Sequence, residues 1–298
     1  MPRGQPLVAT LEPQHHDDDQ VDGELVEHLR RVVQHAEVEL PALPRVAQRA
    51  LALLQDPDVD YRQLGEAVRT DQALAARMLR LVNSAAFARM FKVERIEAAF
   101  ARLGRRTLQS VILAMSLKGL ALEKSGVEGA LGQDLWRHSI CCAAVVGAAS
   151  RRYGLPENDA FLAGLLHDIG KLAVLRVVHA YQESYGQKVP RVLYQRLCDE
   201  WHEPLGRQLA ANWRLQHPLP DIIGNHHATV TADDPLATCR ALVQLAIVTS
   251  ALLGYSPYVP YDFFNLPCMQ VLGLADKPAS HAWLATLPAT IIDQTGMF

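Results

Sequence analysis

Six residues of the chain have the chemistry to hold a divalent metal ion. Histidine is frequent, with 12 in 298 residues. An apolar stretch, FLAGLLHDIGKL, contains an adjacent histidine and aspartate, and burying such a pair is costly unless a partner compensates its polar groups. Neutral imidazole and ionised carboxylate are good ligands for Zn, Fe, Mn or Ni. The candidate ligands are His138, His167, Asp168, His202, His226 and His227.

The spacing of apolar residues puts these candidates on separate helices. His138 follows Asp134 by one helical turn, so both side chains can face the same point. His202 lies on an otherwise apolar helix face, where a polar side chain needs a partner. Five imidazoles and one carboxylate from four helices are enough for two metals bridged by Asp168. The helices are expected near residues 134–153, 158–169, 190–213, 219–227 and 236–253.

Two other interpretations of these residues stay open at this stage. The His–Asp pair could be a solvated helix end, with its histidine near the negative end of the helix dipole. The whole set could also be a group of unrelated surface and core histidines. The remaining histidines after the N-terminal arm have no such neighbours and are interpreted as ordinary surface residues: His28, His35, His179, His217 and His281.

The N-terminal half is also predicted to be helical. Asp60 and Asp71 are placed to cap two helices at their N-termini. A helix that begins at Ile96 is expected to stop at Gly104, after which a new helix starts. The glycine-rich stretch 118–133 predicts a boundary between two helical layers. Strand signals are scarce, so the predicted fold class is all-α, with two helical lobes packed into one body.

Composition and charge exclude several classes of protein. The net charge is −3, so no global basic field would hold nucleic acid or an anionic membrane. No apolar run of 18 residues and no secretory signal occurs, so we expect no membrane span and a cytoplasmic location. The five cysteines form no CxxC pair and are interpreted as reduced thiols. Residues 1–21 are predicted to be a flexible arm.

Other activities have weaker support in the sequence. Cys141 and Cys142 near His138 could suggest a thiol nucleophile, but they also fit an apolar helix of small residues. Arg105 and Arg106 lie between two predicted helices, as in a DNA-reading helix-turn-helix, but no wider basic face supports that function. Neither a P-loop nor a GxGxxG motif is present, so nucleotide binding through those loops is not predicted.

The motifs, taken in order, resemble those of the HD superfamily of metal-dependent phosphohydrolases. They resemble most the HDOD family, the HD-related output domains of bacterial signalling proteins. The resemblance spans about residues 40–255 and is carried by the helical signature at 40–87 and by LWRHSI, FLAGLLHDIGKL and HEPLGRQLAANWRLQHPLPDIIGNHH. It implies a helical N-terminal lobe packed on an HD-type helical lobe. The expected divisions are an arm at 1–21, the helical lobe at 22–125, the HD-like lobe at 126–275 and a tail at 276–298.

Two departures from the HD enzymes weaken an enzymatic interpretation. Ile247 stands where the resemblance leads us to expect a second aspartate, and isoleucine cannot bind a metal. The Gly-Tyr-Pro element of relatives that cleave cyclic di-GMP is absent after the His-His pair. The side of the site that contains His138 is therefore expected to lack one ligand. If a metal binds, its expected ligands are Asp168, His202, His226 and His227.

The resemblance and the departures together imply a signal-transduction output module, of the kind found in response regulators, that acts through a signalling protein partner. The alternative is a metal-dependent phosphohydrolase of nucleotides or other phosphate esters, in which Asp168 and Lys171 would take part in catalysis. A divalent metal (Fe, Mn, Zn or Ni) is the expected cofactor. A small phosphorylated ligand is a further expected partner, whereas membrane and nucleic acid are not expected.

Overall fold

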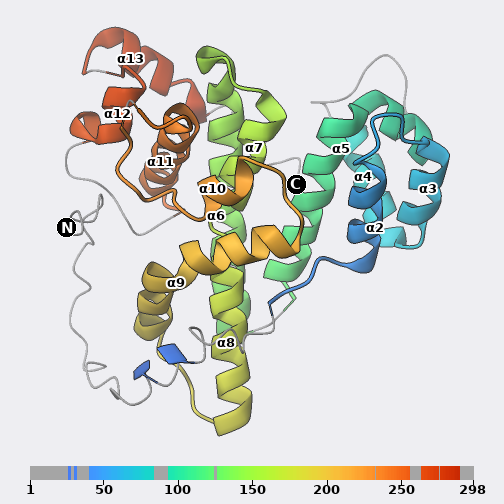
Figure 1. Ribbon diagram of the computed structural model, residues 1–298, viewed down its shortest axis with the longest axis horizontal. Helices are drawn as coiled ribbons and strands as arrows, with labels where there is room; N and C mark the ends of the chain where they lie inside the picture. Colours follow the sequence, from blue (N-terminus) through green and yellow to red (C-terminus); the bar gives the residue numbers. More distant parts are fainter. Residues whose placement is uncertain are drawn as a thin grey trace.

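The computed structural model is helical wherever it describes regular structure (Figure 1). It describes residues 26–27, 30–31, 40–83, 93–123, 126–231, 233–255, 263–274 and 276–288. For this part of the chain the all-α prediction is confirmed. The predicted arm at 1–21 and two histidines of the first expected helix, His28 and His35, lie outside the described residues. The expected lobe boundaries stay predictions.

Four helices form the group drawn in blue and blue-green at the right of Figure 1. They are α2 (Arg45–Leu53), α3 (Tyr61–Arg69), α4 (Gln72–Val82) and α5 (Ile96–Ala121). The predicted N-caps are confirmed, because Asp60 accepts a hydrogen bond from the Arg62 N–H at 2.8 Å and Asp71 accepts one from the Leu74 N–H at 2.9 Å. Each cap satisfies a backbone donor that the first helical turn leaves unpaired.

Helix α5 consists of two segments joined at Gly104. This glycine has φ 74° and ψ 163°, a conformation that residues with a Cβ rarely adopt, so the predicted helix stop is confirmed. Arg105 follows it and donates a hydrogen bond to the Leu54 carbonyl at 3.1 Å. That hydrogen bond links α5 to the end of α2. It also occupies a guanidinium group that would contact DNA if these helices formed a helix-turn-helix.

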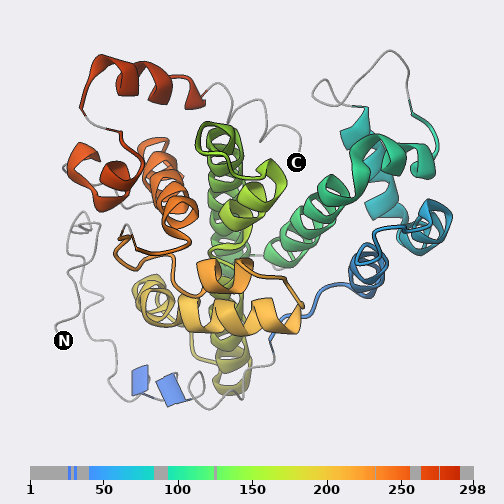
Figure 2. The same ribbon diagram turned by 45° about the horizontal axis from the view of Figure 1, so that its top comes forward.

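The remaining helices surround the candidate metal ligands. They are α6 (Gly126–Ser150), α7 (Glu157–Leu166), α8 (Gly170–Tyr185), α9 (Arg191–Asn212), α10 (Leu219–Ile223), α11 (Ala237–Leu252), α12 (Pro267–Val271) and α13 (Pro278–Leu284), with 3-10 turns η1 (Arg151–Tyr153) and η2 (Phe263–Asn265). Both views place α5 between this group and α2 to α4 (Figures 1 and 2). Helix α5 contacts α6 and α7 on one side and α2 to α4 on the other, so it joins the two lobes.

Three predictions of helix position are wrong, and glycines explain two of them. Helix α10 ends at Ile223 instead of near residue 227, so the His226-His227 pair lies in the turn that follows it. Helix α6 begins at Gly126 instead of near residue 134. Within the predicted boundary stretch, Gly132 packs so closely on Ala121 that a Cβ would overlap the Ala121 carbonyl oxygen. Helix α8 was not predicted, because Gly170 follows the His–Asp pair at what looked like a helix end. At both positions the glycine allows two helices to pack closely, and it does not mark the end of a helix.

The approach at Gly170 brings the start of α8 against the middle of α9. A Cβ on Gly170 would overlap the His202 carbonyl oxygen and lie 2.7 Å from the Gly206 nitrogen. Asp168 lies two residues before this crossing, and His202 lies at it. The crossing therefore sets the distance between two of the candidate ligands.

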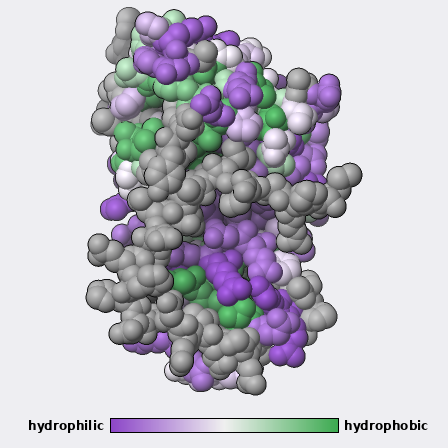
Figure 3. Space-filling view, turned by 90° about the vertical axis from the view of Figure 1, so that its left-hand side faces the viewer, coloured by the Kyte–Doolittle hydropathy of each residue, from purple (hydrophilic) through white to green (hydrophobic). Residues whose placement is uncertain are grey.

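No helix in the described part of the chain is long and apolar enough to cross a membrane. The face shown in Figure 3 mixes hydrophilic side chains with smaller hydrophobic patches. Large exposed apolar side chains such as Tyr185, Val192 and Leu252 belong to three different helices, α8, α9 and α11.

Candidate metal centre

Four buried histidines carry their ring proton on Nδ1. Three of these nitrogens face backbone carbonyls, which can only accept a hydrogen bond. The fourth faces the Ser250 hydroxyl, which already donates to the Ile247 carbonyl at 2.9 Å and therefore accepts from the ring. Nε2 of each ring consequently keeps an unshared electron pair. The pairs are His138 to Ser250 at 2.7 Å, His167 to the Gly164 carbonyl at 2.8 Å, His202 to the Cys198 carbonyl at 2.5 Å and His226 to the Ile223 carbonyl at 3.0 Å.

The four Nε2 atoms converge on Asp168. Those of His138 and His167 are 3.1 Å apart, and those of His202 and His226 are 3.3 Å apart. Asp168 Oδ2 lies 3.3 Å and 3.4 Å from the first pair. Asp168 Oδ1 lies 3.6 Å from each nitrogen of the second pair. Each carboxylate oxygen thus faces one pair of imidazoles, so the site has two sides that share one aspartate.

This arrangement fits a bound cation. The two Nε2 atoms of each pair point electron pairs at one another, which is unfavourable without a positive charge between them. Asp168 is 1% exposed, and its Oδ1 has no hydrogen-bond donor among the described residues. Burial lowers the pKa of His202 to about 3 and also lowers the pKa of His226, so protons do not supply the charge near neutral pH. A divalent ion would supply it, and imidazole and carboxylate suit such an ion.

Lys171 places a fixed positive charge on one side only. Its Nζ lies 2.6 Å from Asp168 Oδ2. Burial by itself would raise the pKa of Asp168, but the Lys171 charge and the neighbouring His167 and His138 rings hold that pKa well below its usual range. The other oxygen, Oδ1, has no such partner in the described structure. The side formed by His202 and His226 is therefore where a carboxylate oxygen still needs a cation.

His227 completes this side at its rim. Its ring centroid lies 4.3 Å from that of His226 and 5.1 Å from that of His202, and its outer edge is exposed. Glu203 accepts the His227 backbone N–H at 2.9 Å, and Gln244 donates to the His226 carbonyl at 2.8 Å, so α9 and α11 fix the histidine pair. Four possible ligand atoms on this side, one from each residue, lie within 4.8 Å of one another; they belong to Asp168, His202, His226 and His227.

All six predicted ligands and Lys171 thus meet in one place, and their role in binding a metal stays a prediction. Two residues next to His138 were not predicted as part of the metal cluster. Cys142 Sγ lies 3.7 Å from His138 Nε2, and the i,i+4 spacing of the two residues was the available signal. Ser250 comes from α11 and had no sequence signal. Burial raises the pKa of Cys142 well above its usual value, so the thiol stays protonated and is not an activated nucleophile.

Asp134 does not join the cluster. Its exposed carboxylate pairs with Arg191 at 3.1 Å, whereas His138 on the next turn is buried. The two residues share only the lining of a cavity of about 110 Å³, which also includes Asp168 and Lys171. The cavity lies on the Oδ2 side of the site.

Acidification is expected to destabilise the chelator-treated protein well before the carboxylates titrate. His202 stays neutral in the fold down to a pKa of about 3, whereas it takes up a proton near pH 6.5 when unfolded. Between these values the unfolded state binds the extra proton, so stability falls as the pH falls, by about 1.4 kcal/mol per pH unit. Urea unfolding at pH 7 and pH 5 should show a loss of about 2 kcal/mol from this residue alone.

The matched variants for this prediction are His202→Gln and His217→Gln. The first should show a smaller pH dependence, because it removes the titrating group. The second should keep the wild-type dependence, because the His217 side chain is 74% exposed. Equal stability of the wild-type protein at pH 7 and pH 5 would contradict the buried, neutral state of His202.

Comparison with known proteins connects this geometry to a family. The sequence model of the HDOD domain matches residues 40–229, more than half of the chain. An HDOD domain protein of Geobacter sulfurreducens has a solved structure that is 25% identical, with a TM-score of 0.67 over 93% of this chain and 98% of its own. A structure from Shewanella amazonensis, named a metal-dependent phosphohydrolase, is 20% identical, with a TM-score of 0.67 over 90% of this chain and 98% of its own.

Two further relatives extend the comparison. A structure from Marinobacter aquaeolei, named a signal transduction protein, is 21% identical, with a TM-score of 0.65 over 92% of this chain and 66% of its own. An uncharacterised protein of Treponema pallidum is 26% identical over 251 residues, which are 78% of this chain and 48% of that protein. The chain therefore spans about half the length of that relative. The structures below 25% identity show a shared fold.

Proposed function

Since the chain belongs to the HDOD family, we propose that it is a bacterial signal-transduction output module that acts in the cytoplasm through a protein partner. The domain family and the name of the Marinobacter relative support a role in signalling. The buried histidine cluster would then serve as a structural or regulatory metal site, and the surface around it would carry the signal to a partner.

The main observation that supports this proposal is the small size of the cavity beside Asp168. Its volume is about 110 Å³, whereas clefts that bind small organic ligands measure roughly 300–1,000 Å³. A phosphate ester as large as a nucleotide does not fit there. Lys171, which could otherwise offer its charge to a phosphoryl group, is paired with Asp168 Oδ2. Both observations support an ion, and not a nucleotide, as the ligand of the cluster.

The metal site itself is expected on one side of Asp168. Ile247 on α11 replaces the carboxylate expected for the Oδ2 side, and Lys171 already compensates that oxygen. The Oδ1 side keeps His202, His226 and His227 as ligands. A divalent ion held there would supply positive charge and Lewis acidity, which the alternative function, hydrolysis of phosphate esters, would require.

Turnover assays separate the two functions. We expect no hydrolysis of a panel of nucleotides and aryl phosphates by the protein loaded with Mn, Fe, Ni or Zn, beyond the background given by Asp168→Ala. Affinity purification from extracts of the source bacterium should instead retain a signalling protein in stoichiometric amount. Robust hydrolysis that is lost in Asp168→Ala would reject the proposal in favour of a phosphohydrolase.

A further inference from the structure

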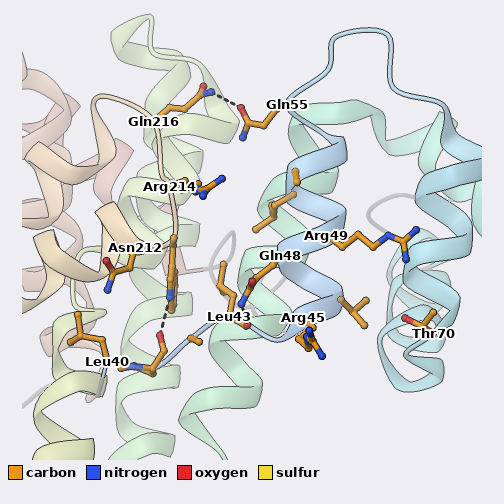
Figure 4. Close-up of a pocket in the computed structure, with 16 residues that line it drawn as sticks. Leu40, Leu43, Arg45, Gln48, Arg49, Gln55, Thr70, Asn212, Arg214 and Gln216 are labelled. Carbon is orange, nitrogen blue, oxygen red and sulfur yellow. Dashed lines mark hydrogen bonds between the residues drawn. The ribbon is translucent and has the colours of Figure 1, made fainter. Parts of the chain in front are cut away.

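A large cleft separates α2 from the loop that follows α9. Its volume is about 1190 Å³, and Figure 4 shows side chains from both walls lining it. Three arginines and four amide side chains line the cleft, with no carboxylate among the lining residues. None of the six candidate metal ligands lines it either, so it is separate from the histidine cluster.

Two hydrogen bonds join the walls of this cleft. The buried indole N–H of Trp213 donates to the Pro41 carbonyl at 3.0 Å, and the Gln216 amide donates to Gln55 at 2.6 Å (Figure 4). Arg214 lies in sequence between these two anchors. Its backbone is therefore held in place, and Figure 4 shows its side chain extending from the loop toward α2.

Arg214 has an unfavourable backbone conformation for its residue type. Its φ is 54°, and it is the one non-glycine residue with positive φ in the described part of the chain. Helices α11 and α12 end with the same pair of backbone hydrogen bonds but use Gly254 and Gly273 at the equivalent position. Glycine is favoured there because a Cβ strains the left-handed conformation. An arginine at this position indicates that its side chain has a role.

The arginines of the cleft have no charge partner within the described structure. Arg45, Arg49 and Arg214 are exposed, and none makes an ion pair or side-chain hydrogen bond with another described residue. Figure 4 places Arg45 at the lower end of α2 and Arg49 on the side of that helix nearer Thr70. Three uncompensated positive charges around a cleft without carboxylates attract an anion.

We propose that this cleft binds a small phosphorylated molecule of about nucleotide size, with Arg214 as its main phosphate contact and Arg45 and Arg49 adding charge. A guanidinium offers a planar pair of donors that matches two phosphate oxygens. The volume is large enough to admit a nucleotide, and Gln48 and Asn212 offer donors and acceptors for its uncharged part. This inference does not depend on the function proposed for the histidine cluster.

A small ligand fits these observations better than an acidic peptide. The two hydrogen bonds between the walls limit the length of chain that could lie along the cleft. All three arginines belong to the lining of this one cleft. An acidic peptide remains one outcome of the test.

Calorimetry with the full chain tests the proposal, using ATP as the probe in buffer with a chelator, so that ions at the histidine cluster do not contribute. Inorganic phosphate and a glutamate-rich peptide are the comparison probes. We expect saturable ATP binding that is weakened about 10-fold or more in Arg214→Gly and in Arg214→Gln. Arg214→Gly should also melt about 2 °C higher than the wild type, because glycine relieves the backbone strain.

The control variant is Arg196→Gln, which removes an exposed arginine of α9 that lies outside the cleft. It should bind ATP as the wild type does. The proposal is overturned if ATP does not bind, if Arg214→Gly binds ATP as tightly as the wild type, or if Arg196→Gln loses as much affinity. Tighter binding of the glutamate-rich peptide than of ATP, lost in Arg214→Gln, would also overturn it in favour of a peptide site.

Discussion

Replacing Asp168 with alanine is expected to lower the metal content of the protein by more than about 10-fold. Asp168 faces both pairs of imidazoles, with Oδ2 toward His138 and His167 and Oδ1 toward His202 and His226. Its removal takes the carboxylate from both sides at once. Elemental analysis of protein purified without chelator measures the effect.

The histidine variants show which side holds the metal. His202→Ala and His227→Ala should lower the metal content more than His138→Ala does, because Lys171 already compensates the oxygen on the His138 side. The metal-loaded protein should keep its ion as the pH falls through the range in which free imidazole titrates, because burial lowers the pKa of His202 to about 3, and should release it only at a pH low enough to protonate the buried rings. His217→Ala is the control, because that ring lies outside the cluster and pairs with Asp221.

Two results would contradict this assignment. An equal loss of metal from His138→Ala and His202→Ala would mean that both sides of Asp168 hold an ion. The absence of stoichiometric metal from the wild-type protein would mean that the cluster joins helices through hydrogen bonds alone. In that case the thermal stability of the wild type should not change on adding Mn, Fe, Ni or Zn.

The parts of the structure that could be predicted from sequence are those set by neighbouring residues. The caps at Asp60 and Asp71 bond to backbone groups two and three residues away, so local chemistry decides them. The six candidate ligands could be found because buried histidine and aspartate have few alternatives to pairing or metal binding. Their division into two sides around Asp168 was expected from the resemblance to the HD enzymes, whereas the distances between them could not be predicted, because those depend on how the helices cross.

The features that could not be predicted depend on contacts between segments that are distant in the sequence. Ser250 orients His138 across 112 positions, and neither residue indicates the other in the sequence. The arginine-lined cleft brings α2 next to the loop after α9, with Trp213 bonded to Pro41 across 172 positions. Glycine is the most ambiguous signal in this sequence, because a helix end and a close helix crossing both favour it, and only the structure distinguishes the two.

Replacing Gly170 with alanine is expected to destabilise the fold by about 3 kcal/mol or more. The new Cβ would overlap the His202 carbonyl and approach the Gly206 nitrogen to 2.7 Å, so both obstructing groups are backbone. Backbone atoms of a helix cannot rotate away as a side chain can, so α8 and α9 would have to separate. Separation moves Asp168 away from His202, so the variant should also lose metal if it folds.

Gly119→Ala is the matched control for this prediction. Gly119 is an exposed residue inside α5, and a Cβ there would have no atom within 4 Å. Alanine is a better helix former than glycine, so this variant should be unchanged or more stable by up to about 1 kcal/mol. Urea unfolding of both variants beside the wild type gives the comparison. If Gly170→Ala were as stable as Gly119→Ala, the crossing of α8 and α9 would be looser than the structure shows, and the distance between Asp168 and His202 would not be fixed by it.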